Sequence, residues 1–204
     1  MTRRIRTIAG RLAGLAACLL LAGCADATPT RFYTLSSLLA APGEAAPGTA
    51  QDLTIGVGSV TLPEYLNRPQ VVTRDGSNRV TLADFDSWIE PLQGLFARTL
   101  VENLSLLLGT DDVLLLPQRR PVRADYQVEV DVTRFDVDRS GHAVLDARWW
   151  ILGEGAEAVL RNGRSTIVEP ATAGDQAEGA QALSRAIGRM SREIAGAIAD
   201  QAGG

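Results

Sequence analysis

The longest regular pattern in the chain is an alternation of apolar and polar side chains near its middle. From residue 126 to residue 132 every second side chain is apolar, and the apolar positions then shift by one residue to Phe135 and Val137. A period of two predicts a β-strand. A shift of one residue inside a strand is what a β-bulge produces, so we expect one long, bulged strand over residues 126–137.

A second long strand is predicted over residues 143–152, after a turn at Ser140-Gly141. Apolar side chains fall on both of its faces, and the adjacent Trp149 and Trp150 must point to opposite faces. Coverage of both faces is typical of a layered α/β body. We therefore expect helices to cover both indoles. The alternative is that one indole lines a lipid or partner groove.

Shorter apolar runs predict the remaining strands, and dipeptides that favour turns separate several of them. Asp75-Gly76 and Asn162-Gly163 each lie between β-favouring runs and predict hairpin turns. Residues 36–52 are rich in Pro, Gly and Ala and predict a loop or insertion. The remaining predicted strands cover residues 31–35, 53–60, 71–73, 79–82, 113–117 and 166–168.

Apolar side chains recur at steps of three and four over residues 87–108, which predicts a helix that ends at Gly109. Its start has two readings. Ser87 and Glu90 fit a capping box, but Glu90 at the cap with Pro91 at the first helical position fits equally well.

A second amphipathic helix is predicted from Asp175, with Glu178 as its capping partner, through Ile198. Small residues are frequent along it. They favour close packing on a sheet, and the alternative is self-association through that face.

The amino-terminal segment has the form of a lipoprotein leader. Four arginines flank an apolar stretch from Leu12 to Ala22, which is too short to cross a hydrocarbon core of about 30 Å. Leu21-Ala22-Gly23-Cys24 then follows the Leu-small-small-Cys pattern of lipoproteins. We therefore expect residues 1–23 to be a cleaved signal peptide, Cys24 to be acylated, residues 24–30 to be a tether and residues 31–204 to be a single domain.

The residue after the cysteine bears on localisation. Ala25 stands where an aspartate would favour retention in the inner membrane of a Gram-negative cell. The outer membrane, with the protein facing the periplasm, is therefore the expected location, although Asp26 follows one position later.

Charge and composition exclude several partners and chemistries. Without the leader the chain has 16 basic and 24 acidic side chains, a formal charge of −8, so nucleic acid is not an expected partner. All 20 basic residues are arginine, which excludes a Walker A lysine and a Schiff base. Apart from Cys18 in the leader and Cys24 there is no thiol, and His142 is the single histidine. No metal site, cofactor or catalytic residue is therefore predicted.

Paired carboxylates occur at residues 111 and 112, 129 and 131, and 136 and 138. Because they alternate along strands or lie in predicted turns, we interpret them as solvated side chains. His142 falls beside a predicted turn and is interpreted as a polar turn residue.

The segment from Leu62 to Val72, with Tyr65, Leu66, Arg68, Pro69 and Gln70 at its centre, carries a family resemblance. Together with Trp88-Ile89-Glu90-Pro91-Leu92 and the two long predicted strands, it resembles the ABC-type transport auxiliary lipoproteins of the PqiC/YmbA kind. The order of these features after the Cys24 motif makes the resemblance stronger. The sequence departs from the pattern of that family at two places, at Ile89, where alanine is common, and at the insertion over residues 36–52.

The resemblance implies an α/β fold, specifically a three-layer sandwich with a mixed β-sheet and two main helices, like the amino-terminal domain of TolB-type proteins. It also implies a non-enzymatic auxiliary subunit of an MCE/ABC-type system that moves lipid between the inner and outer membranes. The implied partners are an MCE-domain periplasmic protein and, in many genomes, an ABC permease and ATPase. A homo-oligomeric ring would suit a lipid conduit, which needs an axial opening.

The five motif residues, Tyr65, Leu66, Arg68, Pro69 and Gln70, are the candidate partner-binding residues. The competing interpretation is structural, because Pro69 keeps Arg68 extended and the arginine can bond loop carbonyls. For the whole chain, the alternatives to an adaptor are a lipid carrier with its own apolar cavity and a hydrolase. The hydrolase is disfavoured because no nucleophile motif is present.

Overall fold

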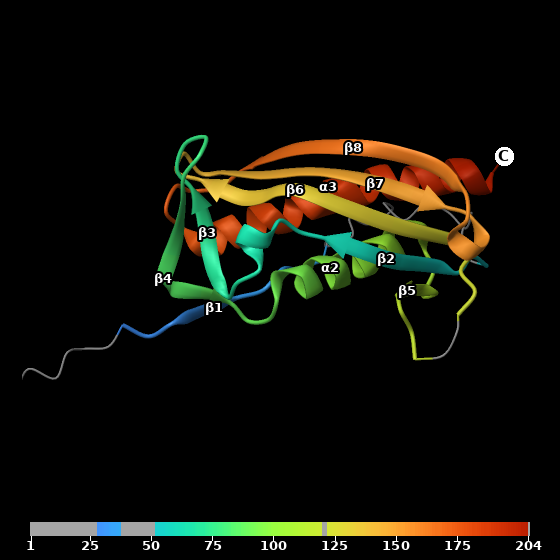
Figure 1. Ribbon diagram of the computed structural model, residues 1–204, viewed down its shortest axis with the longest axis horizontal. Coiled ribbons are helices and arrows are strands. Elements are labelled where there is room, and N and C mark those ends of the chain that lie inside the picture. Colours follow the sequence, from blue (N-terminus) through green and yellow to red (C-terminus); the bar gives the residue numbers. More distant parts are fainter. Residues whose placement is uncertain (1–27, 38–51, 120–121, 204) are drawn as a thin grey trace, which may run out of the picture.

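The alternating segment in the middle of the chain forms the central strand of a mixed sheet. The computed structural model describes residues 28–37, 52–119 and 122–203, and within them eight strands form this sheet (Figure 1). Strand β6 (Tyr126–Asp138) is followed by β7 (His142–Leu152) and β8 (Val159–Pro170) as an antiparallel meander. The register of β6 against β7 shifts between Val132 and Arg134, which confirms the predicted bulge.

The other edge of β6 is shared by two strands that run parallel to it, one after the other. Strand β2 (Ile55–Thr61) pairs with the first half of β6, and β3 (Gln70–Arg74) pairs with its last residues. Residues 62–69, which include the short helix η1 (Glu64–Leu66), span the gap between them. Each of these strands begins a separate extension of the sheet.

Beyond β2 lies the short parallel strand β5 (Val113–Leu115). Beyond β3 lie antiparallel β4 (Val80–Trp88) and then β1 (Arg31–Tyr33), which runs parallel to β4. The predicted hairpin at residues 75–76 is confirmed, because β3 and β4 are joined there and Gly76 has a φ of 76°.

Both helices pack on the same face of the sheet. The ring of Phe96 in α2 (Leu92–Leu108) meets Phe135 of β6 edge to face at 5.2 Å, and α3 (Gln176–Ala202) lies over β7 and β8. The two helices also contact each other, where the buried Asn103 Nδ2 donates to Ser191 Oγ (3.2 Å).

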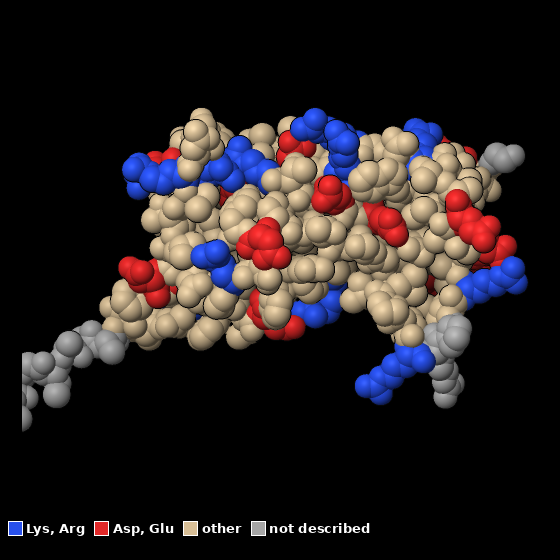
Figure 2. All heavy atoms as spheres, viewed as in Figure 1, with Lys and Arg blue, Asp and Glu red and all other residues tan. Residues whose placement is uncertain are grey.

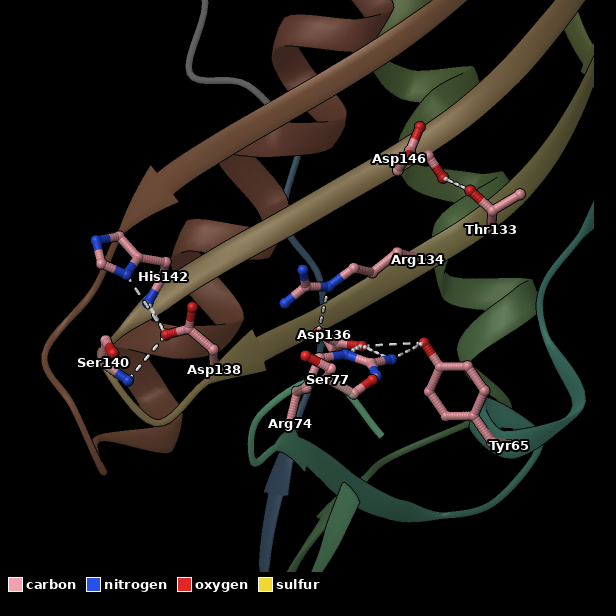
Figure 3. Close-up of polar contacts among 10 residues, drawn as sticks. All are labelled: Tyr65, Arg74, Ser77, Thr133, Arg134, Asp136, Asp138, Ser140, His142 and Asp146. Atoms are coloured by element: carbon pink, nitrogen blue, oxygen red, sulfur yellow. Dashed lines mark hydrogen bonds and ion pairs between the residues drawn. The ribbon is translucent and has the colours of Figure 1, made fainter. Parts of the chain in front are cut away.

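The α/β class, the mixed sheet and the two main helices are therefore confirmed, but the layering differs from the expectation. The described residues form two layers and not three, and the helices lie behind the strands in Figure 3. The physical reason is the composition of the face of the sheet that is turned away from the helices, which we call the open face. Polar side chains on this face, such as Glu129, Asp131 and Arg148, alternate with the core residues. Figure 2 shows charges of both signs spread over the molecule on this side.

The helix ends agree in part with the sequence patterns. Gly109 caps α2 in the left-handed conformation, as predicted. The capping box at Ser87 is wrong, because Ser87 belongs to β4, and Pro91 directly precedes the first helical residue without a side-chain cap. In α3, Asp175 accepts hydrogen bonds from the first-turn amides as predicted. Glu178 instead accepts from the amide of Thr172, and so fixes the loop before the helix.

The hairpin predicted at Asn162-Gly163 is wrong. Strand β8 passes straight through these residues, and β7 turns into β8 at η2 (Glu154–Ala156). Gly163 lies opposite Trp149, and a Cβ atom there would lie 2.3 Å from the indole Cζ2. The glycine is therefore needed for space and not for a turn.

Trp149 is buried beneath α3, and its Nε1 donates to Ser165 Oγ (3.1 Å). Trp150 lies on the open face and is half-buried. The expectation that helices cover both indoles is therefore wrong for Trp150.

Candidate functional site

The candidate site lies where residues 62–69 bridge the gap between β2 and β3. Here no strand among the described residues pairs with the edge of β6, and the open face of the sheet carries Asp136. The carboxylate of Asp136 is fully buried on this face. Side chains from the bridging segment, from the end of β3 and from β6 itself enclose it (Figure 3).

Two arginines and one tyrosine bind the Asp136 carboxylate. Arg74, at the end of β3, donates through Nε (2.9 Å) and Nη2 (2.8 Å) to Oδ2. Arg134 donates through Nε to Oδ1 (2.9 Å). Tyr65 Oη donates to Oδ2 (3.0 Å) and accepts from Arg74 Nη2 (3.1 Å). The four side chains form one network, which we call the Asp136 cluster.

The cluster carries an excess of one positive charge and perturbs its members. Burial raises the pKa of the Tyr65 hydroxyl, and the negative charge of Asp136 raises it further, so Tyr65 stays protonated. The hydrogen bonds to Asp136 raise the pKa of the Arg74 guanidinium. The hydrogen bonds to the buried carboxylate fix the bridging segment to the central strand β6. They therefore favour a structural role for the Asp136 cluster.

The other motif residues serve the same bridging segment. Leu66 is buried in the core, and Arg68 Nε donates to the carbonyl of Tyr65 (2.8 Å). Pro69 is exposed, while its carbonyl accepts from the Trp88 amide (2.7 Å), and Gln70 begins β3 opposite Ser87.

The bond from Arg68 to a loop carbonyl is the contact that the structural interpretation of the motif requires. The exposed surface of the segment is formed by Pro69 together with Glu64 and Asn67.

A polar cleft of about 650 Å³ adjoins the Asp136 cluster. It lies between the β3–β4 turn and the β6–β7 turn, and its lining includes Arg74, Arg134 and Arg139 as well as the hydroxyls of Ser77 and Ser140. Guanidinium and hydroxyl donors suit the oxygens of a carboxylate or phosphate group.

On the other side of this cleft, Asp138 accepts hydrogen bonds from the amides of Ser140 (2.9 Å) and His142 (3.0 Å) and so fixes the β6–β7 turn. Burial acts to raise the pKa of Asp138, but these bonds leave it below its ordinary value. His142 is exposed at the start of β7, beside the predicted turn.

The sequence identified the motif residues but missed Asp136, Arg74 and Arg134. The interpretation of Asp136 as a solvated carboxylate is wrong, because Tyr65 and the two arginines cover it. One signal was available. The bulge after Val132 marks the stretch of β6 that faces the gap, and bulges occur next to functional sites.

Cys24 and the signal peptide lie outside the described residues. Within those residues no group of three His, Cys, Asp or Glu side chains could hold a metal ion. None of the helices found there is long and apolar enough to cross a membrane.

The described part of the chain is a two-layer α/β domain with a mixed sheet that is open on one face. Residues 62–69 form a loop that the Asp136 cluster binds to the central strand. Residues 33–195 match the sequence model of the ABC-type transport auxiliary lipoprotein component family. The chain therefore belongs to that family. The match confirms the resemblance drawn from the Tyr65–Gln70 motif, and the family is one of transport components and not of enzymes.

Two crystal structures show the same fold. Protein XCC0632 from Xanthomonas campestris, a DUF330 protein, is 18% identical with a TM-score of 0.69, and the match covers 84% of this chain and 97% of that one. An uncharacterized protein is 21% identical with a TM-score of 0.65, over 84% of this chain and 99% of that one. No protein in the search of curated proteins matches the sequence.

Proposed function

We propose that this protein is a non-enzymatic, membrane-anchored adaptor of an MCE/ABC-type system that transports lipid between the inner and outer membranes. The observation that carries the proposal is the family match over residues 33–195. A transport auxiliary component has to connect other parts of a system, and a two-layer body with one polar open face offers a free surface for that purpose.

The membrane anchor in this proposal is the acylated Cys24. Two acyl chains on one residue give stable anchoring, at about 0.8 kcal/mol per buried CH₂ group. Ala25 after the cysteine favours the outer membrane, with the domain in the periplasm. The test is a Cys24→Ser variant, followed by labelling with radioactive palmitate and by membrane fractionation. We expect loss of the label and retention of an unprocessed precursor, whereas the control Cys18→Ser keeps both acylation and outer-membrane location.

The docking surface in this proposal is the exposed side of the bridging segment, formed by Glu64, Asn67 and Pro69. The Asp136 cluster holds this loop in one conformation, which lowers the entropy lost on binding. The partner is the periplasmic end of an MCE-domain protein, with an ABC permease and ATPase further along the system.

The experiment that tests docking places a photo-crosslinking amino acid at Asn67 in the acylated protein in its native envelope. A matched position on the helical layer is the exposed Gln181 of α3. We expect irradiation to join position 67, and not position 181, to an MCE-domain protein identified by mass spectrometry. Equal yields at the two positions, or no such partner at either, contradict the proposal.

A homo-oligomer belongs to the same proposal. Strand β8 pairs only with β7 in the described part of the chain, so its outer edge is open along 12 residues. An open edge of this length favours pairing with another chain. The mass of the detergent-extracted protein, measured by light scattering, tests it: a multiple of the protomer mass supports a homo-oligomer, and a single protomer mass contradicts it.

A second candidate function is a carrier that binds lipid itself, and one observation favours it. A groove of about 670 Å³ opens between the start of α2 and the β2–β5 edge. Its lining is mainly apolar and includes Val60, Pro91, Ala97 and Leu115. Mass spectrometry of lipids that co-purify with the protein separates the two functions. One lipid per chain without a protein partner supports the carrier, and a partner without bound lipid supports the adaptor.

A further inference from the structure

Exposed apolar side chains gather at the end of the molecule formed by β1 and β4. Among the described residues ten large apolar side chains are exposed, and five of them lie on β1, on β4 or directly after β4. They are Phe32, Val80, Leu82, Phe85 and Ile89. The most exposed of these are Phe32 at 61%, Ile89 at 55% and Phe85 at 46%.

Strand register places Phe32, Phe85 and Ile89 on one face. Phe32 lies opposite Ser87 in the parallel β1–β4 pair. Side chains two residues apart share a face of a strand, so Phe85 and Ile89 flank Ser87 on the same side. The alternation of exposure agrees, because Asp86 and Trp88 between them are buried. We call these three side chains the β1–β4 patch.

The reverse face of the same strands is occupied, so the patch cannot turn inward. Arg31 and Tyr33, on either side of Phe32, both bind Asp86, with Arg31 Nη2 donating to Oδ2 (2.9 Å) and Tyr33 Oη donating to Oδ1 (2.8 Å). These bonds hold β1 in register and aim Phe32 outward. An apolar surface held in this way is typical of an interaction site.

The path of the chain indicates what covers the patch. Residues 28–30 lead directly into β1 at this end of the molecule (Figure 1). Phe32 is only eight residues from Cys24, and eight residues span at most about 26 Å when fully extended, at ~3.3 Å per residue. A lipid chain on Cys24 therefore keeps the patch close to the bilayer.

The charges near the patch largely compensate one another. Arg31 forms an ion pair with Asp86, and Arg98 forms one with Glu90 (2.6 Å). Asp84 is exposed beside them and forms no ion pair with another described residue. The surface directly beside the patch is therefore not basic, and contact of the patch with a bilayer must come from its apolar side chains.

We propose that the β1–β4 patch inserts into the interfacial region of the membrane that holds the Cys24 acyl chains, so that the domain sits on the bilayer in one orientation. The proposal rests on the anchor in the proposed function. Phenylalanine and isoleucine side chains enter the headgroup boundary to a depth of about 5–10 Å. The anchor supplies attachment, and the patch fixes the tilt.

The test uses the acylated full-length protein in vesicles of phosphatidylethanolamine and phosphatidylglycerol. Because Cys24 is acylated and Cys18 is in the leader, a Ser87→Cys variant offers a single thiol for an environment-sensitive fluorophore. A matched Glu157→Cys variant places the same fluorophore after η2, at the far end of the molecule (Figure 1). We expect brominated lipid to quench the probe at position 87 on the order of fivefold more than the probe at position 157, since quenching requires contact with lipid.

A second variant keeps the anchor and removes the patch. In the triple variant Phe32→Ser, Phe85→Ser and Ile89→Ser we expect the protein still to float with the vesicles, while the probe at position 87 loses its quenching. The effect should persist in 0.5 M salt, because it does not depend on surface charge; that salt level shortens the Debye length to about 4–5 Å.

Three results would overturn the proposal, and each has a different meaning. Equal quenching at positions 87 and 157 of a protein that floats with the vesicles contradicts insertion of the patch but leaves the anchor at Cys24 intact. A probe at position 87 that is shielded from water but not quenched by lipid indicates a covering protein or a second copy, and contradicts insertion. A protein that does not float contradicts the anchor, and with it the proposed function.

Discussion

At the scale of single residues, the central feature of the candidate site is one buried carboxylate, Asp136, that accepts hydrogen bonds from two arginines at once. Asp136 is fully buried, whereas the side chains of Arg74 and Arg134 are 19% and 31% exposed. Removal of the negative charge leaves two guanidinium groups facing each other without compensation. This asymmetry makes Asp136 more sensitive to substitution than either arginine.

We expect Asp136→Asn to destabilise the protein by about 2–3 kcal/mol, below the usual cost of breaking a fully buried ion pair because both arginines retain some contact with water. Urea unfolding followed by circular dichroism measures it. The control is Asp131→Asn, an exposed carboxylate on the same strand, which should change stability by less than about 0.5 kcal/mol. Equal effects of the two substitutions would show that the cluster contributes nothing beyond an ordinary surface charge.

Gly163 provides a second prediction at this scale. Gly163→Ala should destabilise the protein by about 1–3 kcal/mol, because the new methyl group collides with the buried indole of Trp149. Gly196→Ala serves as a control, because we expect it to change the stability of the protein in the opposite direction. Nothing lies within 4 Å of a Cβ at this exposed helical position, so alanine should stabilise the protein by about 0.5–1 kcal/mol. Thermal melts of the two variants that shift in the same direction would contradict this account.

At the scale of elements, the sequence predicted strands and helices well but not which elements lie beside one another. Period-two alternation located β6, a run with apolar side chains on both faces located β7, and the phase shift after Val132 located the bulge. The tandem placement of β2 and β3 along one edge of β6 leaves no local pattern, because alternation reports which face of a strand is buried and not which strand is its neighbour.

Two errors concern which parts of the structure lie beside one another. The apolar Trp150 led to a predicted helical layer that the described residues do not form, because that face of the sheet carries polar side chains. Asn162-Gly163 led to a predicted turn inside β8, where the indole of Trp149 on the neighbouring strand requires the glycine. The same holds for the candidate site: the motif was visible in the sequence, but Asp136, which holds it, lies 71 residues beyond Tyr65.

The attachment of β1 should depend on pH through Asp86. Burial acts to raise the pKa of Asp86, but hydrogen bonds from Arg31 and Tyr33 leave it below its ordinary value of about 3.9. A carboxylate with a lowered folded-state pKa stabilises the fold above its unfolded pKa and loses this contribution as the pH falls through the folded value.

We therefore expect the stability difference between the wild type and Asp86→Asn to be constant from pH 5 to pH 7 and to shrink below about pH 4. Urea unfolding of both proteins across this range measures it. A difference that stays constant down to pH 3 would contradict the contribution of Asp86.

At the scale of the whole molecule, β6 connects every part of the sheet. It pairs with β7 along one edge and with both β2 and β3 along the other, and the two helices cover one of its faces. Strands β1 and β5 each have three residues and pair with one strand in the described part of the chain. Stability should therefore decrease from the centre of the sheet toward these two edges.

Amide hydrogen exchange measures this gradient. We expect the amides of Val128, Val130 and Val132 to exchange only through global unfolding, and the amides of β1 to exchange fastest among the strands. Uniform protection across the sheet would show instead that the domain opens as a single unit.

The short β1 strand also determines how the domain responds to mechanical tension. Its pairing with β4 is held by Arg31, Tyr33 and Asp86, and the chain then enters the core at Leu35 and bonds to α3 through Ser36. A force applied at the N-terminal end therefore acts on the three residues of β1 before it acts on the hydrogen bonds between the longer strands. Under force β1 separates first, which lengthens the connection while the sheet and its pinned loop keep their shape.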